Sequence, residues 1–112
     1  MTLSFQISLE TARKDLEAFT PQEQLSWACD QFGSGFVLTT SFGIQSAVLL
    51  HMLHCLENGS RVPVVWVDTG YLPQETYLYA EQLQRAFDLD VRVVQSSISP
   101  ARMEAIYGKL WE

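Results

Sequence analysis

The feature that most constrains this chain is an alternation of short apolar runs with helical segments. The runs cover residues 36–40, 62–67 and 91–95, and apolar residues recur at helical spacing after each of them. The first two runs lack a polar face, as is typical of strands covered on both sides. Strands that alternate with crossover helices form a parallel sheet with right-handed connections. The sequence therefore predicts an α/β fold.

The helical segments have recognisable ends. Residues 20–23 form a capping box with proline at the first helical position, and they open a helix that runs to about residue 32. The segment 45–56 is apolar almost all round, so we expect this helix to be buried on more than one face. The other predicted helices cover residues 9–19, 73–87 and 100–107.

Composition excludes several function classes. Apolar residues make up 47% of the 112 residues, which is enough for a packed core. The formal net charge of −6 argues against nonspecific nucleic-acid binding and against a role at an anionic membrane. No apolar run reaches the roughly 20 residues that span a bilayer. Residues 1–10 lack the basic start and apolar stretch of a signal peptide, so we expect a cytoplasmic protein.

The cysteines and histidines do not form a metal or redox motif. Cys29 and Cys55 stand alone, and we interpret both as small buried side chains without a disulfide, although a catalytic thiol remains an alternative. His51 and His54 are three residues apart on one predicted helix, but no third ligand is near them. We therefore predict no metal site.

The end of the first run is a candidate anion site. Ser41, Phe42, Gly43, Ile44 and Gln45 form a short turn between a predicted strand and a helix N-terminus. Such a turn directs free backbone N–H groups and the positive end of a helix dipole at one spot, which suits a phosphate. A plain connection between strand and helix is the competing interpretation. Neither a Gly-x-Gly-x-x-Gly fingerprint nor a Walker lysine is present.

The second run ends in Asp68-Thr69-Gly70. Ligands of open parallel sheets lie beyond the carboxyl ends of the strands. If the first two strands are neighbours, this segment lies beside the turn at 41–45. It supplies a carboxylate, a hydroxyl and a glycine that lets a ring or sugar approach closely. Asp68 is a candidate for a binding residue, a general base or a magnesium ligand.

Several ordered motifs resemble those of the phosphoadenylyl-sulfate (PAPS) reductase family. They are Ser41-Phe42-Gly43-Ile44-Gln45, Asp68-Thr69-Gly70-Tyr71-Leu72, Pro73-Gln74-Glu75-Thr76-Tyr77 and Tyr107-Gly108-Lys109-Leu110-Trp111-Glu112. The similarity covers roughly residues 23–112. It implies a three-layer parallel sheet of the adenine nucleotide α-hydrolase-like type, related to the PP-loop pyrophosphatases. Residues 1–20 would form a helical arm, and residues 21–112 a βαβαβα core.

The resemblance also implies a function. Members reduce PAPS to sulfite and adenosine 3′,5′-bisphosphate in assimilatory sulfate reduction, a step of cysteine biosynthesis, with thioredoxin or glutaredoxin as reductant. The turn 41–45 would hold the phosphosulfate, while Val67, Asp68, Thr69 and Gly70 would lie against adenine and ribose. The form of the turn is similar to the PAPS-specific branch without an iron–sulfur cluster, and adenylyl sulfate (APS) is the alternative substrate.

The chain lacks several features of the family, since the remaining strands and the arginines that clamp the anionic end of the ligand belong to the missing half. The family's catalytic cysteine belongs to a motif far beyond residue 112, and neither Cys29 nor Cys55 matches it. The resemblance therefore implies the N-terminal half of the domain, a truncated half-domain that carries no catalytic residue, is inactive alone and binds nucleotide weakly. A non-catalytic nucleotide-binding or assembly module is the alternative, and a PP-loop ligase-type enzyme is a third.

The resemblance further implies the strand order 3-2-1, with the first strand at an edge that the missing half would cover. Bare apolar edges pair with other chains. We therefore expect the chain to self-associate as a homo-oligomer or to exchange elements with a partner.

Overall fold

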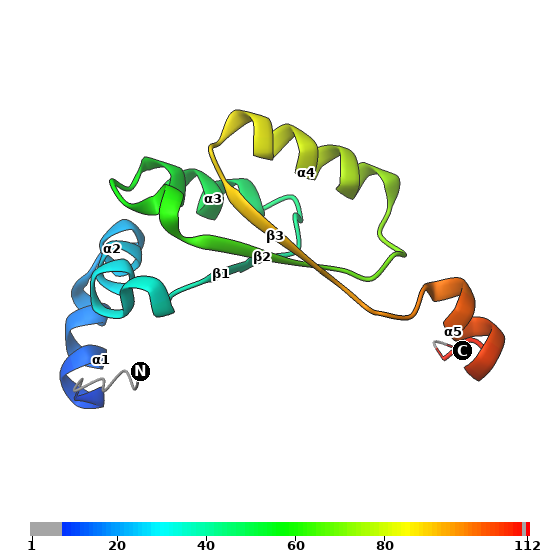
Figure 1. Cartoon of the computed structure of the whole chain (residues 1–112). Helices are drawn as coiled ribbons and strands as arrows, with labels where there is room; N and C mark the ends of the chain where they lie inside the picture. The colour runs from blue at the N-terminus through cyan, green and yellow to red at the C-terminus, as the bar shows by residue number, and fades with distance from the viewer. Residues whose placement is uncertain (1–7, 111) are drawn as a thin grey trace.

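The structure is a computed structural model that describes residues 8–110 and 112. Its strands and helices follow the predicted order (Figure 1). The strands are β1 (Leu38–Thr40), β2 (Pro63–Asp68) and β3 (Asp90–Gln95). The α-helices are α1 (Leu9–Ala18), α2 (Pro21–Phe32), α3 (Ser46–Cys55), α4 (Gln74–Ala86) and α5 (Pro100–Tyr107). Short 3₁₀ turns cover Gly33–Gly35 and Gly59–Arg61.

The three strands form one parallel sheet in the order β1-β2-β3. Thr40 of β1 lies opposite Trp66 of β2, and Trp66 lies opposite Val93 of β3. The α/β class and the strand order expected from the resemblance are both confirmed. In the part of the chain that the structure describes, β1 pairs with β2 alone and is therefore an edge strand.

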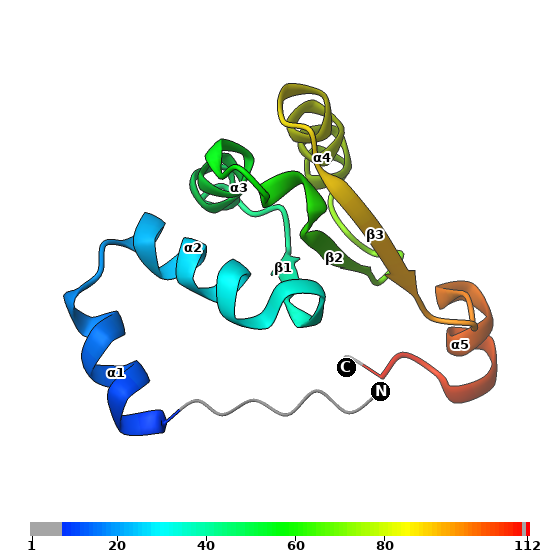
Figure 2. The ribbon, with the colours of Figure 1, turned by 60° about the vertical axis from the view of Figure 1, so that its left-hand side comes forward.

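Helices α3 and α4 lie on the same face of the sheet (Figures 1 and 2). Each connects two neighbouring parallel strands, and the strands follow one another in the same direction across the sheet. Because such crossovers are right-handed as a rule, helices connected in this way lie on the same side. The capping box at α2 is also confirmed. The amide of Glu23 donates to the Thr20 hydroxyl at 3.2 Å, and the Glu23 carboxylate accepts from the Thr20 amide at 3.0 Å.

The core lies between that face and the two helices. Leu50 and Leu53 of α3 are almost completely buried, and Val64 of β2 has no exposed surface. Trp66 is buried beside them, but its indole N–H has no hydrogen-bond partner among the described residues. The buried apolar residues are Leu25, Phe42, Leu50, Leu53, Val62, Val64, Trp66, Ala80 and Leu83.

Two expectations about burial are wrong. Helix α3 is covered on one side only, because Val48 is 64% exposed and Leu49 is 38% exposed. Cys55, at the end of α3, is exposed, and Cys29 is half-buried. An apolar sequence indicates that a helix can be buried on several faces. It does not indicate whether other residues of the same chain pack against each of those faces. Among the described residues, Leu50 and Leu53 of α3 are buried in the core, whereas Val48 and Leu49 on its other side remain exposed.

The molecule is elongated. A compact domain of about 100 residues has a radius of gyration of about 13 Å, whereas the Cα atoms here give 17.5 Å. Helix α5 stands at the far end of β3 and has no buried residue (Figure 1). None of the helices within residues 8–110 is both long and apolar enough to cross a bilayer. Residues 1–7 and Trp111, on which some expectations rest, lie outside the described residues.

Candidate nucleotide site

The turn between β1 and α3 is anchored by Phe42. This residue has a φ of 53°, a left-handed conformation that is uncommon for a bulky side chain. Its side chain is 2% exposed and packs edge-on against Trp66, with ring centroids 4.8 Å apart. The Phe42 amide donates to the Thr40 hydroxyl at 3.1 Å. Because Phe42 points into the core, the next residues of the turn lie on the surface.

The amides that follow Phe42 are available to a ligand. The N–H groups of Gly43, Ile44 and Gln45 donate to no acceptor within residues 8–110 and 112. Helix α3 begins directly after them, and Gln45 at its N-cap position makes no side-chain capping bond. An uncapped helix start leaves N–H donors and the positive end of the dipole open to an anion. The anion site at this turn stays a prediction, for which these amides are candidate donors.

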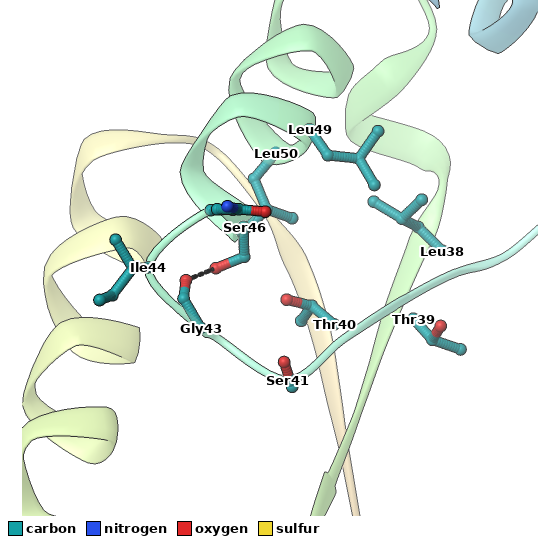
Figure 3. Close-up of a pocket in the computed structure, with 10 residues that line it drawn as sticks. Leu38, Thr39, Thr40, Ser41, Gly43, Ile44, Ser46, Leu49 and Leu50 are labelled. Carbon is teal, nitrogen blue, oxygen red and sulfur yellow. Dashed lines mark hydrogen bonds between the residues drawn. The ribbon is translucent and has the colours of Figure 1, made fainter.

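A hollow of about 560 Å³ lies beside these amides (Figure 3). Leu49 and Leu50 of α3 form an apolar wall, and the Ser41 hydroxyl makes no hydrogen bond to a described residue. The Ser46 hydroxyl donates to the carbonyl of Gly43, which tightens the turn. The residues that line the hollow are Leu38, Thr39, Thr40, Ser41, Gly43, Ile44, Gln45, Ser46, Leu49 and Leu50.

None of these lining residues is a lysine or arginine. Arg61 instead lines a separate pocket with Cys29, at the end of the sheet where β2 begins. Lys109 lies 3.8 Å from the Glu112 carboxylate. An anion in the hollow would therefore depend on backbone amides and on the dipole of α3.

The second predicted segment is organised around Asp68. Its Oδ1 accepts hydrogen bonds from the Tyr77 hydroxyl at 2.7 Å and from the Gly70 amide at 2.9 Å. Its Oδ2 accepts from the Gln95 side chain at 3.1 Å. These bonds, led by that of Tyr77, lower the pKa of Asp68, and the same contact raises the pKa of Tyr77. Asp68 thus links the end of β2 to α4 and β3.

This arrangement disfavours the alternative roles of Asp68. Both of its oxygens already accept hydrogen bonds, and a lowered pKa makes a carboxylate a weaker base. The described residues contain no group of three His, Cys, Asp or Glu that could hold a metal ion. His51 contacts the Cys55 sulfur through Nε2 at 3.6 Å, and His54 accepts from the amide of Asp88. Positioning the loop is the role that the Asp68 contacts support.

The loop after β2 is also fixed to α5. Gly70 has a φ of 81°, and a Cβ atom at this position would lie 2.7 Å from a side-chain carbon of Pro100. The Tyr71 hydroxyl donates to the Glu104 carboxylate, and this bond raises the pKa of Tyr71 to about 12. Sequence reasoning missed these contacts. Tyr71 lies within a quoted motif, but its partner Glu104 is 33 residues away in the chain.

The structure places the predicted site residues in two groups. Ser41, Gly43, Ile44 and Gln45 line the hollow, whereas the Phe42 side chain points into the core. Residues 67–70 stand at the end of the neighbouring strand and do not line it. Val67 is 60% exposed there. Both groups therefore lie at the carboxyl end of the sheet, where β1 and β2 end side by side.

Comparison with known proteins identifies the family. The sequence profile of the phosphoadenosine phosphosulfate reductase domain matches residues 35–112. The chain belongs to this family. The matched range contains the turn at 41–45 and the loop after β2. The PAPS reductase motifs quoted from the sequence thus fall within the part of the chain that the profile covers.

Curated PAPS reductases are similar to the chain over most of its length. The enzyme of a Synechocystis species is 50% identical over 106 residues, which is 95% of this chain and 42% of the relative. The enzyme of a Synechococcus species is 57% identical over 88 residues, which is 79% of this chain and 37% of the relative. The chain therefore spans about two fifths of the length of these curated PAPS reductases.

A solved structure shows the same arrangement. The crystal structure of PAPS reductase from Candida auris, a phosphate complex, matches with a TM-score of 0.79 and 26% sequence identity. The match covers 97% of this chain and 55% of that chain. The three parallel strands and their helices thus correspond to about half of a PAPS reductase chain.

Proposed function

We propose that this chain is the nucleotide-binding part of a thioredoxin-dependent PAPS reductase. In this proposal the turn 41–45 receives the phosphosulfate, and residues 67–70 lie against adenine and ribose. The observation that carries the proposal is the set of three amides, those of Gly43, Ile44 and Gln45, that donate to no described acceptor at the uncapped start of α3. The related Candida auris structure is a phosphate complex, which supports an anion site in this fold.

The whole enzyme would transfer a sulfonate group to a cysteine thiolate. The sulfur–oxygen bond to the phosphate breaks as a sulfur–sulfur bond forms, which releases adenosine 3′,5′-bisphosphate. Thioredoxin or glutaredoxin then supplies two thiols, which become a disulfide, and sulfite leaves. No iron–sulfur cluster takes part in this scheme. The reaction would take place in the cytoplasm and serve sulfate assimilation.

Neither cysteine of the chain is placed for this step. Cys55 lies at the opposite end of α3 from the turn, and a helix of ten residues is about 15 Å long. Cys29 lines the pocket of Arg61 at the other end of the sheet, and burial raises the pKa of its thiol. A raised pKa makes a thiol less nucleophilic at neutral pH. We propose that the chain alone does not reduce PAPS.

Two assays test this proposal. Calorimetric titration with PAPS and with adenosine 3′,5′-bisphosphate should give saturable binding with a dissociation constant weaker than about 1 µM, because no described cation lines the hollow. Adenosine, which lacks phosphate, should bind more weakly still. A sulfite assay with thioredoxin, thioredoxin reductase and NADPH should show no product. Sulfite release by the chain alone, or equal affinity for adenosine, would contradict the proposal.

A non-catalytic binding or assembly module is the second candidate. The observation in its favour is that, among the residues that the structure describes, β1 pairs on one side only and Val67 and Val94 of the sheet are exposed. Such a module would bind a partner polypeptide whether or not nucleotide is present. PAPS or APS would then be a ligand and not a substrate.

A further inference from the structure

Another hollow lies at the end of the sheet opposite the turn at 41–45. It has a volume of about 340 Å³ and is lined by Cys29, Gly33, Ser34, Asn58, Arg61 and Val62. We call this hollow the Arg61 pocket. Strand β2 begins beside it, and a strand of six residues is about 20 Å long. The Arg61 pocket is therefore separate from the proposed nucleotide site at the carboxyl end of the sheet.

The strand order brings the walls of the pocket together. Leu38 of β1 lies opposite Val64 of β2, and the two strands are parallel. The segments that lead into these strands therefore lie at the same end of the sheet. The 3₁₀ turn Gly33–Gly35 precedes β1, and the 3₁₀ turn Gly59–Arg61 precedes β2. Two segments that are far apart in the sequence thus line one hollow.

The polar side chains of the pocket are hydrogen-bond donors without partners in the structure. The Arg61 guanidinium makes no ion pair or hydrogen bond with a residue in the ranges 8–110 and 112. The side chains of Ser34 and Asn58 make no hydrogen bond within these ranges either. A guanidinium carries five N–H donors in a planar fork, an amide carries two and a hydroxyl carries one. These groups together suit the oxygens of an anion.

No carboxylate competes for Arg61 in the pocket. None of the lining residues is acidic. Asp30 and Glu57 are each next to a lining residue in the sequence, but neither forms an ion pair with Arg61. An anion in the pocket would therefore meet one cation and no acidic lining residue.

The pocket also has an apolar wall, and it is small. Val62 is 6% exposed, and Cys29 is half-buried, which raises the pKa of its thiol. Pockets that bind small molecules have volumes of about 300–1,000 Å³. The Arg61 pocket, at about 340 Å³, is near the lower end of this range. Its size favours an inorganic ion or a short organic acid over a nucleotide.

We propose that the Arg61 pocket binds a small oxyanion, namely phosphate, sulfate or the carboxylate of a short organic acid. The planar fork of Arg61 binds two oxygens of such an anion. Asn58 and Ser34 donate further hydrogen bonds, and Cys29 and Val62 contact the rest of the ligand. The proposal does not depend on nucleotide binding, so its failure is distinguishable from failure of the nucleotide site.

The two cysteines allow a test on the unaltered chain. Cys29 lines the pocket, whereas Cys55 is exposed and lies outside it. A bound anion should cover the Cys29 thiol and slow its alkylation by iodoacetamide, a reagent without charge. At ten times the dissociation constant the anion occupies about nine tenths of the pockets, so the rate at Cys29 should fall about tenfold. The rate at Cys55, measured by mass spectrometry of the same samples, should not change.

Three potassium salts are compared in this assay: phosphate, sulfate and butyrate. Potassium chloride at the same ionic strength is the control for screening of charges. Protection of Cys29 by phosphate or sulfate but not butyrate assigns an inorganic anion to the pocket. Protection by butyrate alone assigns an organic acid, and protection by all three assigns an oxyanion site without preference.

Two arginines provide a matched pair of variants. Arg61→Gln should abolish the protection of Cys29, because it removes both the charge and the planar fork. Arg85→Gln removes the same charge near the end of α4, outside the pocket, and should keep the protection. This pair also controls for the general stabilisation that phosphate and sulfate give to folded proteins. Circular dichroism should show that both variants keep the helical content of the parent chain.

Three outcomes would overturn the proposal. The first is that none of the three salts slows alkylation of Cys29 more than chloride does. The second is equal slowing at Cys29 and Cys55. The third is that Arg61→Gln, while folded, keeps the same protection as Arg85→Gln.

Discussion

The hydroxyl of Tyr77 donates a hydrogen bond to Oδ1 of Asp68 at 2.7 Å and so joins α4 to the end of β2. The amide of Gly70 donates to the same oxygen. The carboxylate therefore holds both the loop after β2 and the helix that follows it. In the proposed site this loop contacts the nucleotide, so Asp68 and Tyr77 are positioning residues and neither is expected to exchange protons with a substrate.

Acid should destabilise the fold through Asp68. Its pKa is lower in the folded state than the value of about 3.9 in an unfolded chain. The bond network therefore stabilises the fold fully above pH ~4, and this stabilisation is lost as the pH falls through the lowered folded pKa. Tyr77→Phe should raise the pKa of Asp68, as measured by carbon NMR, and should flatten the acid limb of the melting temperature.

Tyr79→Phe is the control for that variant. The Tyr79 hydroxyl makes only a 3.5 Å bond to the carbonyl of Ile44 and does not contact Asp68. The acid limb of its melting curve should match that of the parent chain. If Tyr77→Phe and Tyr79→Phe have the same acid limb, Asp68 is not the group responsible.

A carboxylate at the start of α3 should raise the stability of the fold and lower the affinity for nucleotide. Gln45→Glu places a negative charge at the N-terminus of α3, which should stabilise the fold by about 0.3–1 kcal/mol. The same charge should repel the anionic end of the nucleotide and reduce its affinity at least about tenfold. Urea unfolding and calorimetric titration measure the two effects.

Gln74→Glu is the matched control. Gln74 is the first residue of α4 and does not line the hollow. The substitution should give a similar gain in stability with little change in nucleotide affinity. Equal loss of affinity in both variants would indicate a general charge effect and would remove the special role of the turn.

Gly70 should resist substitution more than Gly108, which has a similar positive φ. Gly70→Ala places a side chain at a φ of 81°, which costs about 1–3 kcal/mol, and also brings Cβ within 2.7 Å of Pro100. Gly108→Ala has the backbone strain alone, because nothing lies within 4 Å of its Cβ position at a φ of 76°. Urea unfolding should show a larger loss for Gly70→Ala. Equal losses would mean that contact with α5 adds nothing.

Phe42 should contribute to the stability of the fold, because its side chain anchors the turn in the core. Phe42→Ala removes a side chain that is 2% exposed and packed on Trp66, so the free energy of unfolding should fall by about 3–5 kcal/mol. The left-handed φ of Phe42 should also relax, which would partly offset the loss. A loss below about 1 kcal/mol in urea unfolding would show that the turn is not anchored in the core.

Local signals in the sequence were sufficient to predict the elements. The cap at Thr20, the proline at position 21 and Ser99 before Pro100 each marked a helix start that the structure confirms. The apolar runs predicted the strands, because a run of apolar residues is a signal that is read from neighbouring positions in the sequence. The turn at 41–45 was found for the same reason, since it stands between a run and a helix.

Contacts between different segments of the chain could not be predicted from local sequence patterns. The Tyr77–Asp68 and Tyr71–Glu104 bonds join residues that no local pattern connects. The left-handed residue of the turn is Phe42 and not the adjacent glycine, because the aromatic ring is drawn into the core against Trp66. The sequence predicted that Val48 would be buried, but Val48 is exposed. The apolar pattern of a helix does not indicate whether other residues pack against each of its faces.

The most direct test is an NMR titration of the ¹⁵N-labelled chain with adenosine 3′,5′-bisphosphate. The amide signals of Gly43, Ile44 and Gln45 should move together and saturate with a single dissociation constant, while signals around the Arg61 pocket stay in place. Saturable binding that leaves those three amides unchanged, or no binding at millimolar nucleotide, would contradict an anion site at the start of α3.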